Sequence, residues 1–203
     1  FRLIISFALP LLLGNLFQQF YNLADTRIVG QFIGENAIAA VGATSALNSV
    51  IVGFLNGLTN GFALVTARFF GAKDFDRMRK TVGLSITLGV ATGAVLTAAS
   101  LCFLTPLLRA LNTPDEIIPQ AKAYIAVILA GMLITMMYNV CAACLRAIGD
   151  TVSPLIFLII ATILNVGLDI LFILGFKMDV EGASYATLIA QAVSVVLCII
   201  YIF

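Results

Sequence analysis

Two acidic residues, Asp25 and Asp169, stand inside long apolar stretches of this sequence. Asp169 is the clearer case, because apolar sequence continues on both sides of it, whereas Asp25 falls in the last third of its stretch. If these stretches cross a membrane, each charge costs about 2.5–3.5 kcal/mol on insertion scales and should face a cavity or a partner. An interfacial position near a helix end is the alternative for Asp25.

Other polar residues accompany these carboxylates at helical spacing. Successive members of a group are three or four residues apart, or 14 in the pair of tyrosines, and these offsets place the side chains on one face of a helix. The groups are Asn15, Gln18, Asn22 and Asp25; Thr162, Asn165 and Asp169; Ser184, Thr187, Gln191 and Ser194; and Tyr124 with Tyr138. We therefore expect four helices with a polar stripe on an otherwise apolar surface.

The chemistry of these stripes favours cation binding. Asp169, Asn165 and a threonine hydroxyl offer oxygen acceptors, which suit a hard cation such as Na⁺. A partly buried carboxylate can also take up a proton near neutral pH. Interhelical hydrogen bonding, worth about 0.6 kcal/mol per contact, is the alternative for the serines, threonines and glutamines. A packing bond does not need a charge, however, so the carboxylates favour Na⁺ or H⁺ coupling.

The composition indicates what must position these residues. Of the 203 residues, 62% are hydrophobic and 10% are charged, and the mean hydropathy is +1.12. A soluble domain is about 45–50% apolar and about 25% charged, so we expect a polytopic all-α membrane protein. The chain has no histidine, which excludes Ser-His and Cys-His catalytic pairs and histidine zinc sites. We expect no enzyme, no cofactor, no metal beyond a coupling Na⁺ and, with a net charge of +1, no nucleic-acid partner.

Six stretches between charged residues are long enough to cross a bilayer, which needs about 20 mostly apolar residues. The expected spans are residues 3–28, 37–66, 81–108, 119–143, 153–176 and 182–203. Together they form a single transmembrane unit, residues 1–203. The absence of an initiator methionine and of a polar flank after the last span leads us to expect a fragment of a longer chain.

The placement of lysine and arginine predicts the orientation of these spans, because cytoplasmic loops carry the excess. With a cytoplasmic N-terminus, one side would hold seven of these residues and the other four. The seven are Arg2, Arg68, Lys73, Arg77, Arg79, Lys80 and Arg146, and the four are Arg27, Arg109, Lys122 and Lys177. We therefore expect both termini on the cytoplasmic side.

Glycines and cysteines within the spans have simpler interpretations. Gly53, Gly57 and Gly61 recur every four residues, as do Gly89 and Gly93, which favours close helix packing. Asn56 and Asn60 beside the first set leave an asparagine-lined wall as the alternative. Cys141 and Cys144 form a C-x-x-C without another ligand, so packing is favoured over a redox or metal role.

Several segments resemble the multidrug and toxic compound extrusion (MATE) family of transporters. They are LPLLLGNLFQQFYNLADTRIVGQFIGENAIAAVG (9–42), NGFALVTARFFGAKD (60–74), LRAIGDTVSP (145–154), NVGLDILFILGF (165–176) and EGASYATLIAQ (181–191). They follow one another in the family's order and spacing over essentially the whole chain. The resemblance implies the N-terminal six-helix lobe of a twelve-helix, two-lobed transporter, with a covalently continuous C-terminal lobe in the full-length chain.

The resemblance also implies a function and roles for individual residues. The family that the chain resembles consists of plasma-membrane antiporters that export cationic, amphipathic compounds, including drugs, in exchange for Na⁺ or H⁺. Asp25, Asn165, Asp169 and Thr187 match its cation or proton site, and Pro10 matches the proline that bends its first helix. Tyr124 or Tyr138 matches a cavity tyrosine, and with Gln18, Asn22 and Gln191 we expect these residues to line the substrate cavity. Arg27 beside Asp25 leaves the identity of the coupling ion open.

Three other functions fit less well. A lipid or lipid-linked oligosaccharide flippase of the same superfamily would tend to carry more cationic charge in its cavity, whereas the intramembrane charges here are acidic. An intramembrane enzyme would need a catalytic pair that the sequence lacks. A non-transporting scaffold subunit is the third alternative, and cation-dependent substrate efflux by the full-length protein would distinguish a transporter from it and from the enzyme.

Overall fold

The computed structural model describes the backbone of residues 2–111 and 113–202. Within these ranges the side chains of residues 2–4, 6, 7, 21, 25, 35 and 36 are outside the description. The described ranges contain helices and no strand. The elements are α1 (Arg2–Phe32), α2 (Glu35–Gly71), α3 (Phe75–Cys102), α4 (Leu104–Ala110), α5 (Ile118–Ala130), α6 (Met132–Ala147), α7 (Val152–Ile170), the π-helical turn η1 (Leu171–Gly175) and α8 (Val180–Ile202).

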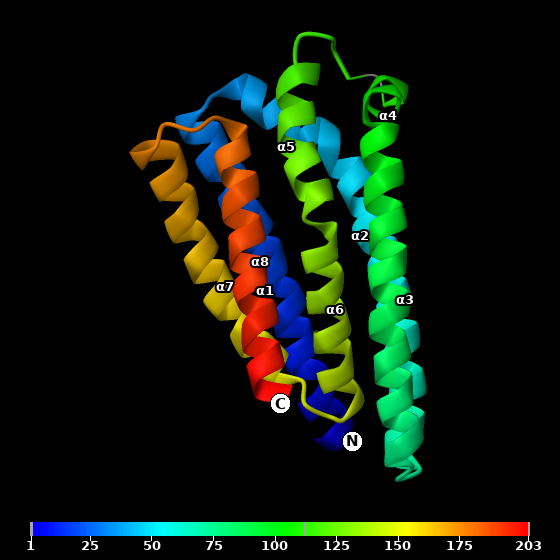
Figure 1. Ribbon diagram of the computed structural model, residues 1–203. Coiled ribbons are helices and arrows are strands. Elements are labelled where there is room, and N and C mark those ends of the chain that lie inside the picture. Colours follow the sequence, from blue (N-terminus) through cyan, green and yellow to red (C-terminus); the bar gives the residue numbers. More distant parts are fainter. Residues whose placement is uncertain (1, 112, 203) are drawn as a thin grey trace.

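The long helices run up and down in one bundle, and α1 begins at the end of the molecule where α8 stops (Figure 1). Helix α7 packs against α1 and α8, while α6 packs against α2, α3 and α8. Large apolar side chains such as Leu55, Met136 and Val140 are fully buried where these helices meet. The central position of α6 follows from its contacts on three sides.

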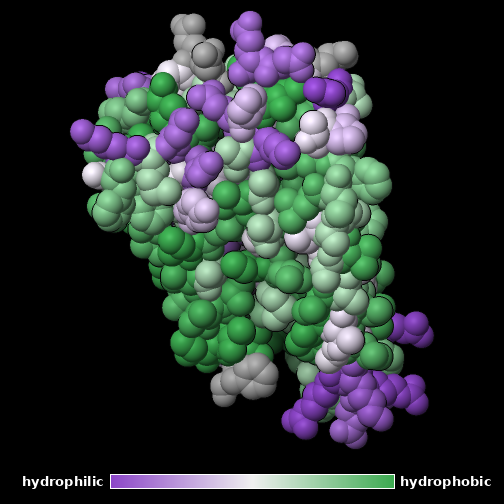
Figure 2. Space-filling model, turned by 45° about the horizontal axis from the view of Figure 1, so that its top comes forward, coloured by the Kyte–Doolittle hydropathy of each residue, from purple (hydrophilic) through white to green (hydrophobic). Residues whose placement is uncertain are grey.

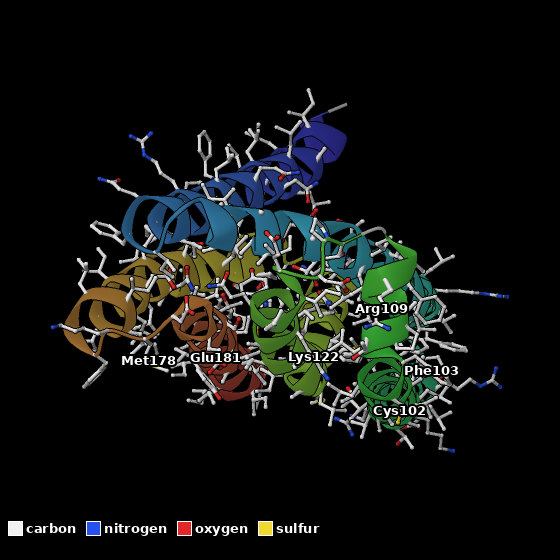
Figure 3. All side chains as sticks on the ribbon, turned by 90° about the horizontal axis from the view of Figure 1, so that it is seen from above. Cys102, Phe103, Arg109, Lys122, Met178 and Glu181 are labelled. Atoms are coloured by element: carbon white, nitrogen blue, oxygen red, sulfur yellow. The ribbon has the colours of Figure 1, made fainter. Side chains whose placement is uncertain are left out.

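The outside of the bundle is apolar, as expected for a surface that faces lipid. Val50 is 72% exposed, Ile163 69% and Val95 67%. Figure 2 shows polar side chains gathered at the two ends, with a mostly apolar belt between them. Seen from above in Figure 3, Arg109, Lys122 and Glu181 lie at the end where α4, α5 and α8 meet the loops.

Among the described residues, four helices are long and apolar enough to cross a membrane: α2, α3, α7 with η1, and α8. A fifth span is formed if the bent pair α5 and α6 counts as one. Helix α1, the first of the six expected spans, is 31 residues long but does not meet this criterion on its described residues. The prediction of an all-α membrane lobe is confirmed.

The helix boundaries differ from the expected spans at three places. The expected span at 81–108 is interrupted at Phe103, where α3 ends and the short helix α4 begins. The charged segment after residue 71 is mostly helical, because Asp74 caps α3 by accepting a hydrogen bond from the Arg77 N–H at 3.1 Å. The expected span at 119–143 is broken at Gly131, where α5 and α6 meet at a bend of 46°. A Cβ on Gly131 would overlap the Leu188 side chain, so the missing side chain lets the bend approach α8.

Glycine spacing alone gave one correct and one wrong packing interpretation. A Cβ on Gly89 would lie 2.9 Å from Met136 Cε, and one on Gly93 would lie 3.1 Å from Leu133 Cδ2, so these glycines allow α3 to approach α6. Gly53, Gly57 and Gly61 have no atom near enough for a Cβ to contact within the described residues. Within the described residues these three glycines therefore allow no close helix approach, and the packing interpretation is wrong there.

Candidate functional site

Asp169 and Asn165 form the most buried polar pair in the lobe. They lie one turn apart on α7, and both side chains are 0% exposed. Thr187, on the facing helix α8, is half-buried beside them. The structure thus brings together three of the four residues expected to bind the coupling ion; the side chain of the fourth, Asp25, lies outside the described residues.

Hydrogen bonds join these three residues into one network. With the Asn165 amide oriented to satisfy both of its ends, its nitrogen donates to Asp169 Oδ2 at 3.2 Å and its oxygen accepts from the Thr187 backbone N–H at 3.2 Å. In the opposite orientation the amide nitrogen reaches Thr187 Oγ1 at 3.4 Å. Asn165 therefore ties the carboxylate on α7 to the backbone of α8.

The backbone changes character directly after Asp169. The turn η1 has a wider hydrogen-bond pattern, in which the Phe176 N–H donates to the Leu171 carbonyl at 3.0 Å. Such π-helical turns occur frequently at functional sites. No group of three or more acidic or cysteine side chains that could hold a metal occurs among the described residues, which do not include the Asp25 side chain.

A separate polar cavity of about 540 Å³ lies between α1, α2, α6 and the start of α7. Amide side chains form much of its wall, and its remaining members are apolar apart from Tyr138, Arg146 and Thr151. The lining residues are Pro10, Leu11, Gly14, Asn15, Gln18, Asn56, Asn60, Ala63, Leu64, Ala67, Tyr138, Asn139, Arg146, Ala147, Thr151, Pro154, Leu155 and Leu158. This volume falls within the range of small-molecule sites.

The cavity includes some of the expected lining residues and not others. Gln18 and Tyr138 line it, and Pro10 lies at its wall. Asn22 is exposed, Tyr124 is 8% exposed in the core, and Gln191 accepts a hydrogen bond from Thr135 Oγ1 at 2.6 Å; none of these three lines this cavity. The expectation that both tyrosines share one face assumed an unbroken helix, whereas the bend at Gly131 separates them.

Asn139 and Arg146 are cavity residues that the sequence analysis missed. Asn139 follows Tyr138 and belongs to no stripe, and Arg146 entered only as a charge at a helix end. The asparagine-lined wall considered for Asn56 and Asn60 is what the cavity shows. The four-residue spacing of Asn56 and Asn60, beside glycines rather than large side chains, was the signal in the sequence for this wall.

The polar stripe of α8 mainly joins helices to one another. Ser184 Oγ donates to the Tyr124 carbonyl at 2.9 Å, and Ser194 Oγ donates to the Phe157 carbonyl at 3.2 Å. The alternative of interhelical hydrogen bonding therefore accounts for these two serines.

Comparison with known proteins identifies the family. The model of a family described as MatE matches residues 10–171 of the chain. The chain belongs to the MatE family. A relative in Bacillus subtilis (strain 168), the probable multidrug resistance protein YpnP, is 30% identical over 98% of this chain and 45% of its own length.

Solved MATE structures have the same fold as this MatE chain. A crystal structure of MATE in the bent conformation matches 100% of this chain over 45% of the length of the solved chain, with a TM-score of 0.93 and 30% identity. A transporter of the MOP superfamily from Pyrococcus furiosus matches 100% of this chain over 44% of the length of the solved chain, with a TM-score of 0.92 and 30% identity. That protein is described as having a reverse polarity of its binding pocket that suggests a different function. The MatE chain thus spans about half the length of these relatives.

Proposed function

We propose that this MatE chain is part of a secondary active antiporter that exports cationic or amphipathic small molecules, including drugs, in exchange for Na⁺ or H⁺. The observation that carries the proposal is the 0% exposed carboxylate of Asp169 inside an apolar lobe. An ionised carboxylate at this position is costly, and binding a cation or a proton offsets that cost. The similarity to a probable multidrug resistance protein supports the class of substrate.

In this mechanism the ion binds at Asp169, Asn165, Thr187 and Asp25 while the site is open to the outside. Ion binding alters α1 near Pro10, where the missing N–H permits bending. Pro10 also lies at the cavity wall, so the bend changes the cavity and lowers its affinity for substrate. The ion can drive export only because it binds the two states with different affinities.

The other half of the transporter is a second lobe in the full-length chain, because alternating access needs two repeats that move against each other. We place the protein in the plasma membrane with a cytoplasmic N-terminus. The lysine and arginine excess at the end formed by α2, α3 and α6 supports that orientation.

Export by the full-length protein in proteoliposomes tests this proposal. Asp169→Asn should abolish substrate export driven by a Na⁺ or pH gradient, because the amide can neither be protonated nor balance a cation. Asp115→Asn, a change at an exposed loop residue, is the matched control and should export like the wild type. The two gradients, applied separately, identify the coupling ion. Unchanged gradient-driven export by Asp169→Asn would refute the assignment.

A flippase for lipids or lipid-linked oligosaccharides is the second candidate. The described lining of the cavity holds Arg146 and no acidic side chain, and a relative of similar fold is described as having a reversed pocket polarity. A flippase should move a fluorescent phospholipid analogue across the proteoliposome membrane, as read by its protection from dithionite. The antiporter should not do so.

A further inference from the structure

The single charged side chain in the described lining of the polar cavity is a cation, Arg146. We propose that this cavity binds an oxyanion, the carboxylate or phosphate group of an amphiphile, against Arg146. The inference deepens the proposed transport function, on which it rests. Of the cationic or amphipathic substrates proposed above, it selects the amphipathic ones that carry a negative group, either zwitterions or anions.

Arg146 has no counter-charge of its own. It is half-buried in the last turn of α6, and it forms no salt bridge or hydrogen bond within the described part of the chain. The neighbouring carboxylate, Asp150, instead accepts hydrogen bonds from the Val152 and Ser153 N–H groups at 3.2 and 3.0 Å. A guanidinium presents a planar fork of donors that matches a carboxylate or phosphate in two-point contact.

Neutral hydrogen-bond donors surround the same space. The amides of Asn56 and Asn60 come from α2, that of Asn139 comes from α6, and the Tyr138 and Thr151 hydroxyls complete the wall. Each of these groups can donate to an oxyanion. Because an amide or hydroxyl can also accept, the sign of the bound charge is set by Arg146.

Apolar residues flank the polar part of the cavity. Leu155 and Leu158 from α7, Leu11 from α1 and Leu64 from α2 line it. A ligand that fills this space would place an oxyanion at Arg146 and apolar groups along the leucines. This division of the wall points to an amphiphile rather than to an inorganic anion.

An arginine in the last turn of a helix also interacts favourably with the helix dipole. That role requires neither a cavity nor a ligand. The two roles differ in the measurement that they affect: the dipole role changes stability alone, whereas the ligand role changes the selectivity between anionic and cationic ligands.

Equilibrium binding to the full-length protein in phosphatidylcholine nanodiscs tests the inference. The probes are 11-(dansylamino)undecanoate and its trimethylammonium counterpart, titrated by dansyl fluorescence with no ion gradient. Transport is not needed for this readout, so it can fail or succeed independently of the coupling test on Asp169. The variants are Arg146→Gln and Arg146→Lys, with Arg109→Gln as the matched control at an exposed position on α4.

The wild type should bind the carboxylate probe more tightly than the ammonium probe. Arg146→Gln should weaken the carboxylate probe about tenfold, as expected for loss of a charged hydrogen bond, and leave the ammonium probe unchanged. Arg146→Lys should retain part of the affinity, and Arg109→Gln should retain all of it. The inference is overturned if the wild type prefers the ammonium probe or if Arg146→Gln binds the carboxylate probe normally.

A cavity-filling variant keeps the test decisive if Arg146→Gln fails to fold. Ala63→Phe leaves Arg146 in place and should weaken the carboxylate probe; normal binding by this variant would place the site elsewhere. Titration in micelles of a non-ionic maltoside detergent, which carries no phosphate, distinguishes the source of the oxyanion. Tighter binding of the carboxylate probe there than in phosphatidylcholine nanodiscs indicates a competing lipid phosphate as the occupant, and equal binding indicates a soluble amphiphile.

Discussion

Asn165 and Asp169 show how a single helical turn joins a charge to a neighbouring helix. Residues four apart lie on one face of α7, so both side chains point toward α8, and the amide spans the space between the carboxylate and the Thr187 backbone. A substitution at Asn165 would thus act on Asp169 and on the contact between α7 and α8 together. We therefore regard Asn165 as a positioning residue as well as a candidate ligand.

The sequence predicted the pair of Asn165 and Asp169, but it predicted only some of the residues that line the cavity. The offset of four residues, with apolar residues around it, is visible in the letters. The inclusion of Asn139 and Arg146 in a cavity depends on how α6 is rotated toward α1 and α2, which no local pattern encodes. A charged residue near the end of a span, such as Arg146, is interpreted as an interfacial residue whether or not it lines a cavity.

At the same scale, Asp150 provides a test of pH dependence. Burial raises the pKa of this carboxyl, but hydrogen bonds from Ser153, Tyr201 and Val152 outweigh burial and lower it below its ordinary value of 3.8. Because the pKa is lowered on folding, the carboxylate stabilises the folded chain above the unfolded pKa, and this contribution is lost as the pH falls through the folded pKa.

Asp150→Ala should accordingly destabilise the protein by about 1 kcal/mol at neutral pH, since the carboxylate caps the start of α7. The difference from the wild type should shrink as the pH falls below 3.8. Thermal unfolding in detergent, followed by circular dichroism at several pH values, measures this difference. A constant difference over the whole pH range would show that the carboxylate charge has no part in the cap.

At the scale of the elements, charge spacing predicted the helices well and their internal breaks poorly. Charged residues mark the loops because they are excluded from lipid, so their spacing measures each span. Gly131 stands in an apolar run that is predicted as one helix, and the side chain that lies against it, Leu188, is 57 residues away. Similarly, Gly57 and Gly89 have the same local pattern, yet only Gly89 has a helix packed against it.

The contact between Gly131 and α8 leads to a prediction. Gly131 has φ −83° and ψ 4°, which any residue can adopt, so the effect of a side chain there is one of space. A Cβ would lie 2.6 Å from Leu188 Cδ1 and 2.8 Å from Cγ. Gly131→Ala should therefore reduce the free energy of unfolding by about 1–3 kcal/mol, and the melting temperature should fall accordingly.

Two further variants control this experiment. Gly57→Ala, at a helical position with open space, should stabilise α2 by up to about 1 kcal/mol. Adding Leu188→Ala should remove the penalty of Gly131→Ala, so that the double variant is no less stable than Leu188→Ala alone. If Gly131→Ala behaves like Gly57→Ala, the close approach of α5 and α6 to α8 does not limit stability.

At the scale of the whole molecule, the buried carboxylate and the cavity occupy different parts of α7. Leu158 is the cavity residue nearest to Asp169 along the helix, and the offset of 11 residues between them corresponds to a rise of about 16 Å. A small ligand at the Arg146 end of the cavity would therefore not contact Asp169. Ion and substrate must then influence each other through helix movement rather than by competing for one group.

This separation predicts how binding responds to the ion. In the wild type, the Kd of an amphiphilic fluorescent substrate should change with Na⁺ concentration or with pH, and by linkage the substrate should change the ion affinity by the same factor. Asp169→Asn should bind the substrate with a Kd that no longer depends on the ion. Filling the cavity with Ala63→Phe should weaken binding at every ion concentration.

The two variants thus separate coupling from recognition in one titration of the full-length protein in nanodiscs. Direct competition would give another pattern, in which Asp169→Asn loses substrate affinity even without the ion. That result would place the substrate at the carboxylate and leave the cavity of α1, α2, α6 and α7 as an access route. An ion-independent Kd with substrate affinity retained would instead establish that Asp169 acts on the cavity from a distance.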